Sequence, residues 1–367
     1  MTFQLPDYKQ PNFDQEPFLS SPDAQVIVVK KPGVAPEHYH ALSIYPEYFK
    51  INGDWILATE SRMDGVPVLR TDGSVHVVEF RNLNVGDKVI VGRREDGHEG
   101  IYVYADGFRS NDTNTDLFAF RSGRSRETAY SMDYNDLYEL LKYEKDHGYI
   151  VWVLGPAVVF DYDSRQALST LISKGYAHAI LAGNAMATHD LEAALFGTAL
   201  GQNTYNQQSP PNAHYHHLDL INKAREAGSL KGLIEQEAID EGVVYSAITN
   251  NVPLVLAGSI RDDGPLPPVI ADVYYAQDEM RKHTRQATTL ICLATQLHTI
   301  ASGNMTPAYT QKNGEIRPVY IYCVDIAEFA VNKLRDRGSL EVTTLVTNVQ
   351  DFVVHLRNNL VQTRQDS

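Results

Sequence analysis

Three charged side chains stand next to one another in a short segment that glycines bound. Arg261, Asp262 and Asp263 lie between Gly258 and Gly264, and a Pro-rich run stiffens the exit. A guanidinium can hold a carboxylate through paired hydrogen bonds, and a carboxylate can bind an ammonium group or take a proton from it. The segment therefore predicts a catalytic site for an amino acid. The alternative is a surface turn whose charges neutralise one another.

Small and polar residues also gather where several apolar runs end. Glycine lets the backbone approach a ligand closely, and the amides at a helix N-terminus bind phosphate. In a parallel sheet the loops after the strands form the ligand site. Four such loops favour an adenine dinucleotide or a similar ligand, although glycine in these loops can also serve turn geometry alone. They are Gly155-Pro156-Ala157, the stretch from Gly183, Asn184 and Ala185 to His189 and Asp190, the segment 258–264, and Ser302-Gly303-Asn304-Met305.

Acidic and imidazole groups add to this pattern. Asp325 directly follows the apolar run 319–324. A carboxylate at a strand end is the usual partner of the ribose hydroxyls of NAD, and it repels the 2′-phosphate of NADP. The same residue can cap the following helix, and the two roles are compatible. His189 and Asp190 form either a proton-transfer pair or the start of a helix. The sequence has no G-x-G-x-x-G, so these residues alone do not name the cofactor.

Other kinds of chemistry have less support. His214, His216 and His217 lack a carboxylate or cysteine at matching helical spacing, so we predict no metal site. The chain has no G-x-S-x-G motif, which argues against a serine hydrolase. Cys292 and Cys323 each lie in an apolar run, and we expect buried free thiols in a reducing compartment.

Composition narrows the class of protein and of partner. The chain has 367 residues, of which 43% are hydrophobic, and this length suits two domains. Its net charge of −14 repels phosphate backbones and anionic lipid, so we expect neither nucleic acid nor a membrane surface as a partner. No signal peptide and no apolar run of ~20 residues is visible. We therefore expect a cytoplasmic protein with a small-molecule substrate.

Two patterns divide the chain into elements that must position these residues. From 48 to 106, short apolar runs alternate with Asn-Gly and Asp-Gly turns, which predicts antiparallel strands. Pro67 cannot donate to a strand ladder, so its run is expected at a sheet edge. Beyond 133, buried runs alternate with helical periodicity, which predicts a parallel sheet covered on both faces. We expect strands at 149–160, 177–182, 252–258, 319–324 and around 345–346, and helices at 135–145, 164–173, 190–195, 218–227, 278–297, 328–335 and 352–360.

The predicted fold class is therefore α/β. Residues 1–125 form a β-rich domain on the substrate side, and residues 126–367 form a Rossmann-like domain that binds a dinucleotide.

The same segments carry a resemblance to a known family. The sequence resembles the archaeal-type ornithine cyclodeaminases, which are related to lysine–oxoglutarate reductase/saccharopine dehydrogenase. The resemblance covers about residues 35–360 and is strongest beyond 150. It rests on LAGNAMATHDLE (181–192), VLAGSIRDDGPLP (255–267), AQDEMR (276–281), LHTIASGNM (297–305) and KLRDRGS (333–339). The sequence departs from the family pattern outside those loops, for example at 160–164.

The resemblance implies an enzyme that binds NAD and converts L-ornithine, or a close diamino acid, to L-proline and ammonia. The hydride taken from the α-carbon returns to the cyclic imine, so there is no net redox change. Net hydride transfer on an amino acid or imine is the alternative reaction, and a non-catalytic NAD-binding protein is the alternative class. The resemblance also implies a homo-oligomer, because β-rich N-terminal domains of such enzymes often pack between subunits. The residues that it places along NAD are Asn184, Ala185, Asp263, Ser302, Gly303, Asn304, Met305, Asp325 and Asp336.

Overall fold

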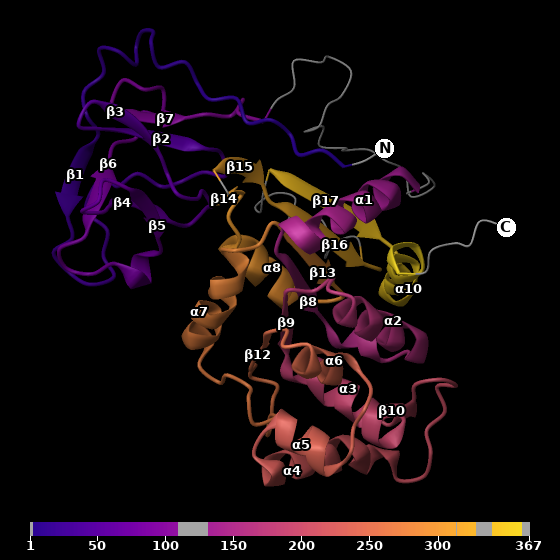
Figure 1. The fold of residues 1–367 in the computed structure, drawn as a ribbon. Coiled ribbons are helices and arrows are strands. Elements are labelled where there is room, and N and C mark those ends of the chain that lie inside the picture. Colours follow the sequence, from indigo (N-terminus) through magenta and orange to yellow (C-terminus); the bar gives the residue numbers. More distant parts are fainter. Residues whose placement is uncertain (1–2, 109–130, 313, 328–339, 362–367) are drawn as a thin grey trace.

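A computed structural model describes residues 3–108, 131–312, 314–327 and 340–361 (Figure 1). The predicted domain boundary near residue 125, the predicted helix 328–335 and Asp336 lie outside these residues. Among the helices of the described part, none has both the length and the apolar character needed to cross a bilayer.

A six-stranded parallel sheet organises the larger part of the chain. Its spatial order is β12-β9-β8-β13-β16-β17, and every neighbouring pair is parallel. Numbered along the chain, this order is 3-2-1-4-5-6, the order of doubly wound dinucleotide-binding sheets. The predicted α/β, Rossmann-like class is thereby confirmed. The strands are β8 Ile150–Leu154, β9 Ala179–Gly183, β12 Leu254–Ala257, β13 Thr289–Leu293, β16 Tyr320–Asp325 and β17 Glu341–Val346.

Helices cover both faces of this sheet because its central strands are apolar on both sides. Every residue of β8 and of β13 is buried, and alternate side chains enter two separate cores. Trp152 packs with the helices of one face and Val153 with those of the other. The first face carries α1 Ser131–His147, α2 Tyr162–Ser173, α3 Asn184–Phe196, α6 Val243–Thr249 and α10 Val349–Leu360, and the second carries α7 Val273–Thr284 and α8 Gln296–Met305. Beyond α3 lie α4 His216–Ala227 and α5 Leu230–Gln236.

The N-terminal region is antiparallel and β-rich, as predicted. It holds a four-stranded sheet of order β1-β6-β4-β5 and a three-stranded sheet of order β3-β2-β7. Pro67 does not lie in an edge strand, because β4 sits between β5 and β6. In β4, only Val68 and Leu69 pair with β6, so the missing amide of Pro67 breaks no bond to that strand. The strands are β1 Gln25–Val28, β2 Glu47–Ile51, β3 Asp54–Leu57, β4 Val66–Leu69, β5 Val75–Val78, β6 Lys88–Val91 and β7 Ile101–Val103.

Two predicted elements beyond residue 133 are wrong. The range of the expected helix 278–297 holds the end of α7, the strand β13 and the start of α8. The β-branched and apolar residues of β13 pair with β8 on one side and β16 on the other, so this run forms a strand. The expected strand 149–160 ends at Leu154, where Gly155 leads into a 3-10 helix, η2 Pro156–Val159. The other described strands and helices that we expected are confirmed, with shifted ends.

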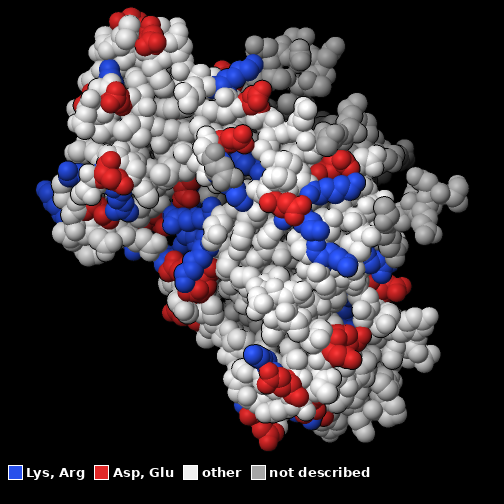
Figure 2. Space-filling model, in the orientation of Figure 1, with Lys and Arg blue, Asp and Glu red and all other residues white. Residues whose placement is uncertain are grey.

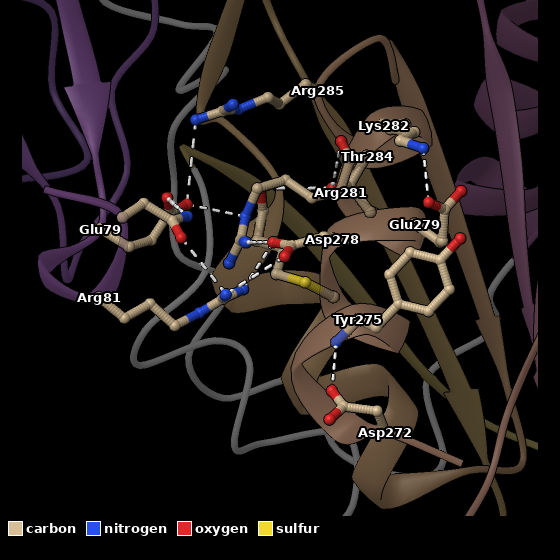
Figure 3. Close-up of polar contacts among 12 residues, drawn as sticks. Glu79, Arg81, Asp272, Tyr275, Asp278, Glu279, Arg281, Lys282, Thr284 and Arg285 are labelled. Atoms are coloured by element: carbon tan, nitrogen blue, oxygen red, sulfur yellow. Dashed lines mark hydrogen bonds and ion pairs between the residues drawn. The ribbon is translucent and has the colours of Figure 1, made fainter. Parts of the chain in front are cut away.

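Ion pairs join the β-rich region to α7. Glu79, which follows β5, contacts Arg281 of α7 with its Oε1 2.7 Å from Nε, and it also pairs with Arg62. Arg81 lies 2.6 Å from Asp278 of α7. Arg285, at the end of α7, donates to Glu60 and to the carbonyl of Val77. Basic and acidic side chains gather along this seam (Figure 2), and Figure 3 shows Glu79 and Arg81 facing α7. We call these side chains the seam network.

Replacing Glu79 by Gln is expected to lower the free energy of unfolding by about 2 kcal/mol, since Arg62 and Arg281 are buried and would lose their shared carboxylate. Burial alone would raise the pKa of Glu79, but these two guanidinium groups outweigh it and hold the pKa below its usual value. The stabilisation is therefore present above the unfolded pKa of about 4.5 and is lost as pH falls through the lower folded value.

The measurement is urea unfolding of the wild type and of Glu79→Gln at pH 7 and at pH 3. The difference between the two proteins should be full at pH 7 and smaller at pH 3. A difference of the same size at both pH values would contradict the electrostatic explanation. Lys282→Gln on the outer side of α7 is the control. Among the described residues Lys282 forms an ion pair with Glu279 alone, at the surface, so its loss should leave the midpoint unchanged.

Candidate functional site

The candidate site lies at the carboxyl edge of the sheet, between β8 and β13. These strands are neighbours, yet β8 leads to helices on one face and β13 leads to α8 on the other. Chain connections that diverge in this way mark the switch point of an open α/β sheet, the place where such sheets bind their ligands. We call this edge of the sheet the crevice. The fold therefore brings the ends of four strands to one place, namely β8, β9, β12 and β13.

Backbone packs directly against backbone at the floor of the crevice. The Gly155 amide donates to the carbonyl of Leu293 at 2.8 Å. A Cβ atom at Gly155 would lie 1.9 Å from the carbonyl oxygen of Ala294, so only glycine fits there. Ala294 itself has a φ of +50°, a backbone angle that residues other than glycine seldom adopt. The ends of β8 and β13 are thus held as close as their backbones allow.

Two helices begin at this edge without a side-chain cap. The N-cap residues are Gly183 for α3 and Thr295 for α8, and neither accepts a hydrogen bond from its helix through a side chain. The first amides of a helix have no partner within it, and together with the helix dipole they favour an anion. The pyrophosphate of a dinucleotide has the charge and the acceptor oxygens that such amides bind. The described residues therefore fit a bound dinucleotide.

The segment 258–264, which the sequence predicted to bind an amino acid, reaches the same edge. Asn184 Oδ1 accepts from the Leu266 amide at 3.0 Å, which fastens the loop after β12 to the start of α3. Asp262 accepts from the Ser259 amide at 2.8 Å, while Arg261 and Asp263 are exposed. Within the described residues, Arg261 makes no ion pair with either carboxylate. The alternative of a self-neutralising turn thus finds no support in its contacts.

His298 occupies this edge, although our sequence reasoning gave it no role. It lies in the first turn of α8, and its Cε1 would be 2.9 Å from a Cβ atom at Gly183. Burial lowers the pKa of His298, and the Asp262 carboxylate partly opposes that shift. The motif LHTIASGNM contained it, but only the fold shows that its ring lies against Gly183 at the end of β9.

His189 and Asp190 do not form a pair, since their side chains reach different partners. Asp190 is fully buried, contacts Arg165 at 2.8 Å and accepts from the amides of Val243 and Val244 at the start of α6. His189 Nδ1 lies 2.9 Å from the buried carboxylate of Glu192. Both residues sit inside α3 rather than at its start. Asp190 is therefore structural, and His189 stays a prediction.

The remaining predicted cofactor residues are spread more widely. We had expected a loop at Ser302, Gly303, Asn304 and Met305. They form the last turns of α8 instead, because this helix already begins at Gln296. The Ser302 hydroxyl is buried and has no hydrogen-bond partner among the described residues. Ala185 is the second residue of α3 and lies at the crevice.

Asp325 ends β16 and accepts from the Ala327 amide at 2.9 Å, as expected of a capping residue. Three strand spacings separate β16 from β9, roughly 14 Å in all. Asp325 and Asn184 would therefore contact different parts of any one ligand.

The histidine cluster after β11 Gln202–Asn203 has other contacts. His216 Nδ1 lies 2.7 Å from the hydroxyl of Thr198, and its ring stacks on Phe196. No group of three His, Cys, Asp or Glu side chains within the described residues is arranged to hold a metal ion.

Known protein families and curated proteins match this chain along most of its length. Residues 137–356 match the family model described as arginine dihydrolase ArgZ-like, C-terminal, Rossmann fold. The ornithine cyclodeaminase of Methanocaldococcus jannaschii is 39% identical over 339 residues, which is 90% of this chain and 76% of that protein.

Solved structures show the same fold. A protein of Methanococcus maripaludis S2, described as a conserved putative LOR/SDH protein, superposes with a TM-score of 0.81 at 34% identity, over 92% of this chain and 98% of its own. AgrE of Nostoc, a bifunctional arginine dihydrolase/ornithine cyclodeaminase, has been solved as a ternary complex with ornithine and NAD+. It gives a TM-score of 0.58 at 34% identity, over 93% of this chain and 46% of its own.

Proposed function

Because this chain belongs to the archaeal-type ornithine cyclodeaminase family, we propose that it binds NAD and converts L-ornithine, or a close diamino acid, to L-proline or its homologue and ammonia. The observation that carries the proposal is the carboxyl edge of the sheet at β8 and β13. There, the uncapped start of α3 is hydrogen-bonded to the loop of Arg261, Asp262 and Asp263, and the uncapped start of α8 lies nearby. A relative with the same fold holds ornithine and NAD+ together.

The residues of the crevice divide into two sets by their chemistry. NAD, when bound, accepts a hydride from the substrate and returns it. The amides of Asn184 and Ala185 at the start of α3 would hold its phosphates, and Asp263 with Asp325 would receive hydroxyl groups. We assign Ser302, Gly303, Asn304, Met305 and Asp336 to the same ligand on the resemblance alone.

The substrate's α-amino acid group carries a carboxylate and an ammonium group, so the site needs one cationic and one anionic side chain. Arg261 would bind the α-carboxylate through paired hydrogen bonds, and Asp262 would attract an ammonium group. Arg261 is exposed and free of ion pairs among the described residues, so its guanidinium is available to a ligand. We expect His189 to act in catalysis only through Nε2, since Glu192 holds Nδ1.

Feeding ornithine and NAD to the purified chain tests the proposed reaction. Proline should form without accumulation of NADH. Stoichiometric NADH would instead support net hydride transfer on an amino acid. Bound NAD with turnover of neither kind would support a non-catalytic protein, and a panel of diamino acids identifies the substrate.

Asp262→Asn is expected to lower kcat/KM for ornithine by about 10- to 100-fold, because a hydrogen bond between charged groups is replaced by a neutral one. Asp263→Asn should weaken NAD binding instead, measured by titration calorimetry. Asp219→Asn is the control, since that carboxylate is exposed on α4 away from the crevice. Full activity in both Asp262→Asn and Asp263→Asn would show that the site lies elsewhere.

We also propose a reducing, cytoplasmic location and a homo-oligomer. Cys292 and Cys323 are free and buried, which suits a compartment that keeps thiols reduced. Light scattering on the purified protein gives the oligomeric state, and a monomeric mass would contradict the expected oligomer.

A further inference from the structure

His298 is an imidazole beside the crevice with little to hold it in place. Its Nδ1 lies 3.5 Å from the hydroxyl of Thr295, at the limit of a hydrogen bond, and Nε2 has no hydrogen-bond partner among the described residues. The ring is partly exposed and lies against Gly183 at the start of α3, so Nε2 is available to a ligand.

The surroundings of His298 suit a proton acceptor. Burial lowers the pKa of His298 below its usual value near 6.5, so the ring is neutral at pH 7. Asp262 is the charged group that faces it from the β12–α7 loop, and within the described residues no cation faces it. A nearby carboxylate stabilises the imidazolium that forms when the ring takes a proton.

The proposed reaction needs such a group. An amino acid enters as an ammonium ion, and its nitrogen must have a free electron pair before the C=N bond can form. We propose that Nε2 of His298 takes the proton from the substrate's α-ammonium group, with Asp262 stabilising the charged ring. The N–H bond breaks, its electron pair stays on the amine nitrogen, and the proton moves to the imidazole. This assignment rests on the proposed function and takes the role of base from His189.

The position of Gly183 supports the same assignment. Because Gly183 has no side chain, the His298 ring can lie against the start of α3. His189, by contrast, lies inside α3, with Nδ1 bound to Glu192 and its ring edge against Phe160. The Asp262 carboxylate acts electrostatically on His298.

Activity measurements on His298→Ala give the first test. We expect kcat for proline formation to fall about 100-fold or more, since general-base catalysis contributes about that much. The acid limb of the wild-type pH profile should disappear, and added imidazole should restore part of the activity. His283→Ala is the matched control: that histidine also has a pKa lowered by burial, but it contacts Tyr149 away from the crevice. Unchanged pH dependence in His298→Ala, or loss without rescue by imidazole, would overturn the assignment.

A second measurement does not depend on turnover. The ¹⁵N signal of His298, identified by its absence in His298→Asn, should titrate below pH 6.5 and move toward the protonated position when ornithine is added. No movement at saturating ornithine would overturn the assignment. If the wild type makes no proline but the His298 signal responds to ornithine, the proposed reaction is wrong and the assignment of His298 as the proton acceptor stands.

Discussion

Gly155→Ala is expected to reduce proline formation by at least about 100-fold, because displacing reacting groups by ~1 Å already costs that much. The new methyl group would lie 1.9 Å from the carbonyl oxygen of Ala294, where neither partner is a flexible side chain. The ends of β8 and β13 would have to separate, and the first turn of α8 would move with them. Steady-state kinetics and calorimetric titration with NAD measure the two consequences.

Gly258→Ala is the control for this prediction. Gly258 also follows a strand at the same edge, but its added Cβ would meet the nearest atom, the Ile270 oxygen, at 3.0 Å. A shift of a few tenths of an ångström relieves that contact. We therefore expect less than a tenfold change. Equal losses in both variants would mean that the effect comes from any added methyl group at this edge, and not from the β8–β13 contact.

Asp190→Asn is expected to lower the free energy of unfolding by about 3 kcal/mol. Arg165 is 1% exposed and Asp190 is fully buried, with 2.8 Å between Nε and Oδ1. Burial would lower the pKa of Arg165, but Asp190 and Glu241 outweigh it and raise the pKa. The substitution leaves a buried guanidinium that only the partly exposed Glu241 can balance. It also turns an amide group toward the Val243 and Val244 amides, which need an acceptor.

Urea unfolding followed through Trp152 in a Trp55→Phe background measures this loss in the parallel-sheet region, where Trp152 is fully buried. Glu235→Gln is the control, because its contact with Lys231 is 4.0 Å long and exposed at both ends, so the midpoint should not move. The ion pair would be shown to contribute little if Asp190→Asn unfolded at the same urea concentration as the control.

Local sequence patterns predicted most strands of the parallel sheet. The runs that became β8, β9, β12 and β16 are mostly apolar, as strands buried on both faces must be. The run that became β13 was missed, since Thr289 to Leu293 is also compatible with a helix when read alone. Pairing with β8 and β16 decided between the two, and pairing is not a local property.

The charged residues Arg261, Asp262 and Asp263, and the loops that suggested a dinucleotide, were evident from residue types and spacing. The sequence by itself determined which side chains could bind an amino acid and a phosphate, because those abilities belong to the groups themselves. Only the tertiary structure decided which of them meet. It bound Asp190 to Arg165, placed Ser302 to Met305 in a helix, and brought His298 against Gly183 at the start of α3. The order of the strands sets these distances, and residues far apart in the chain fix that order together.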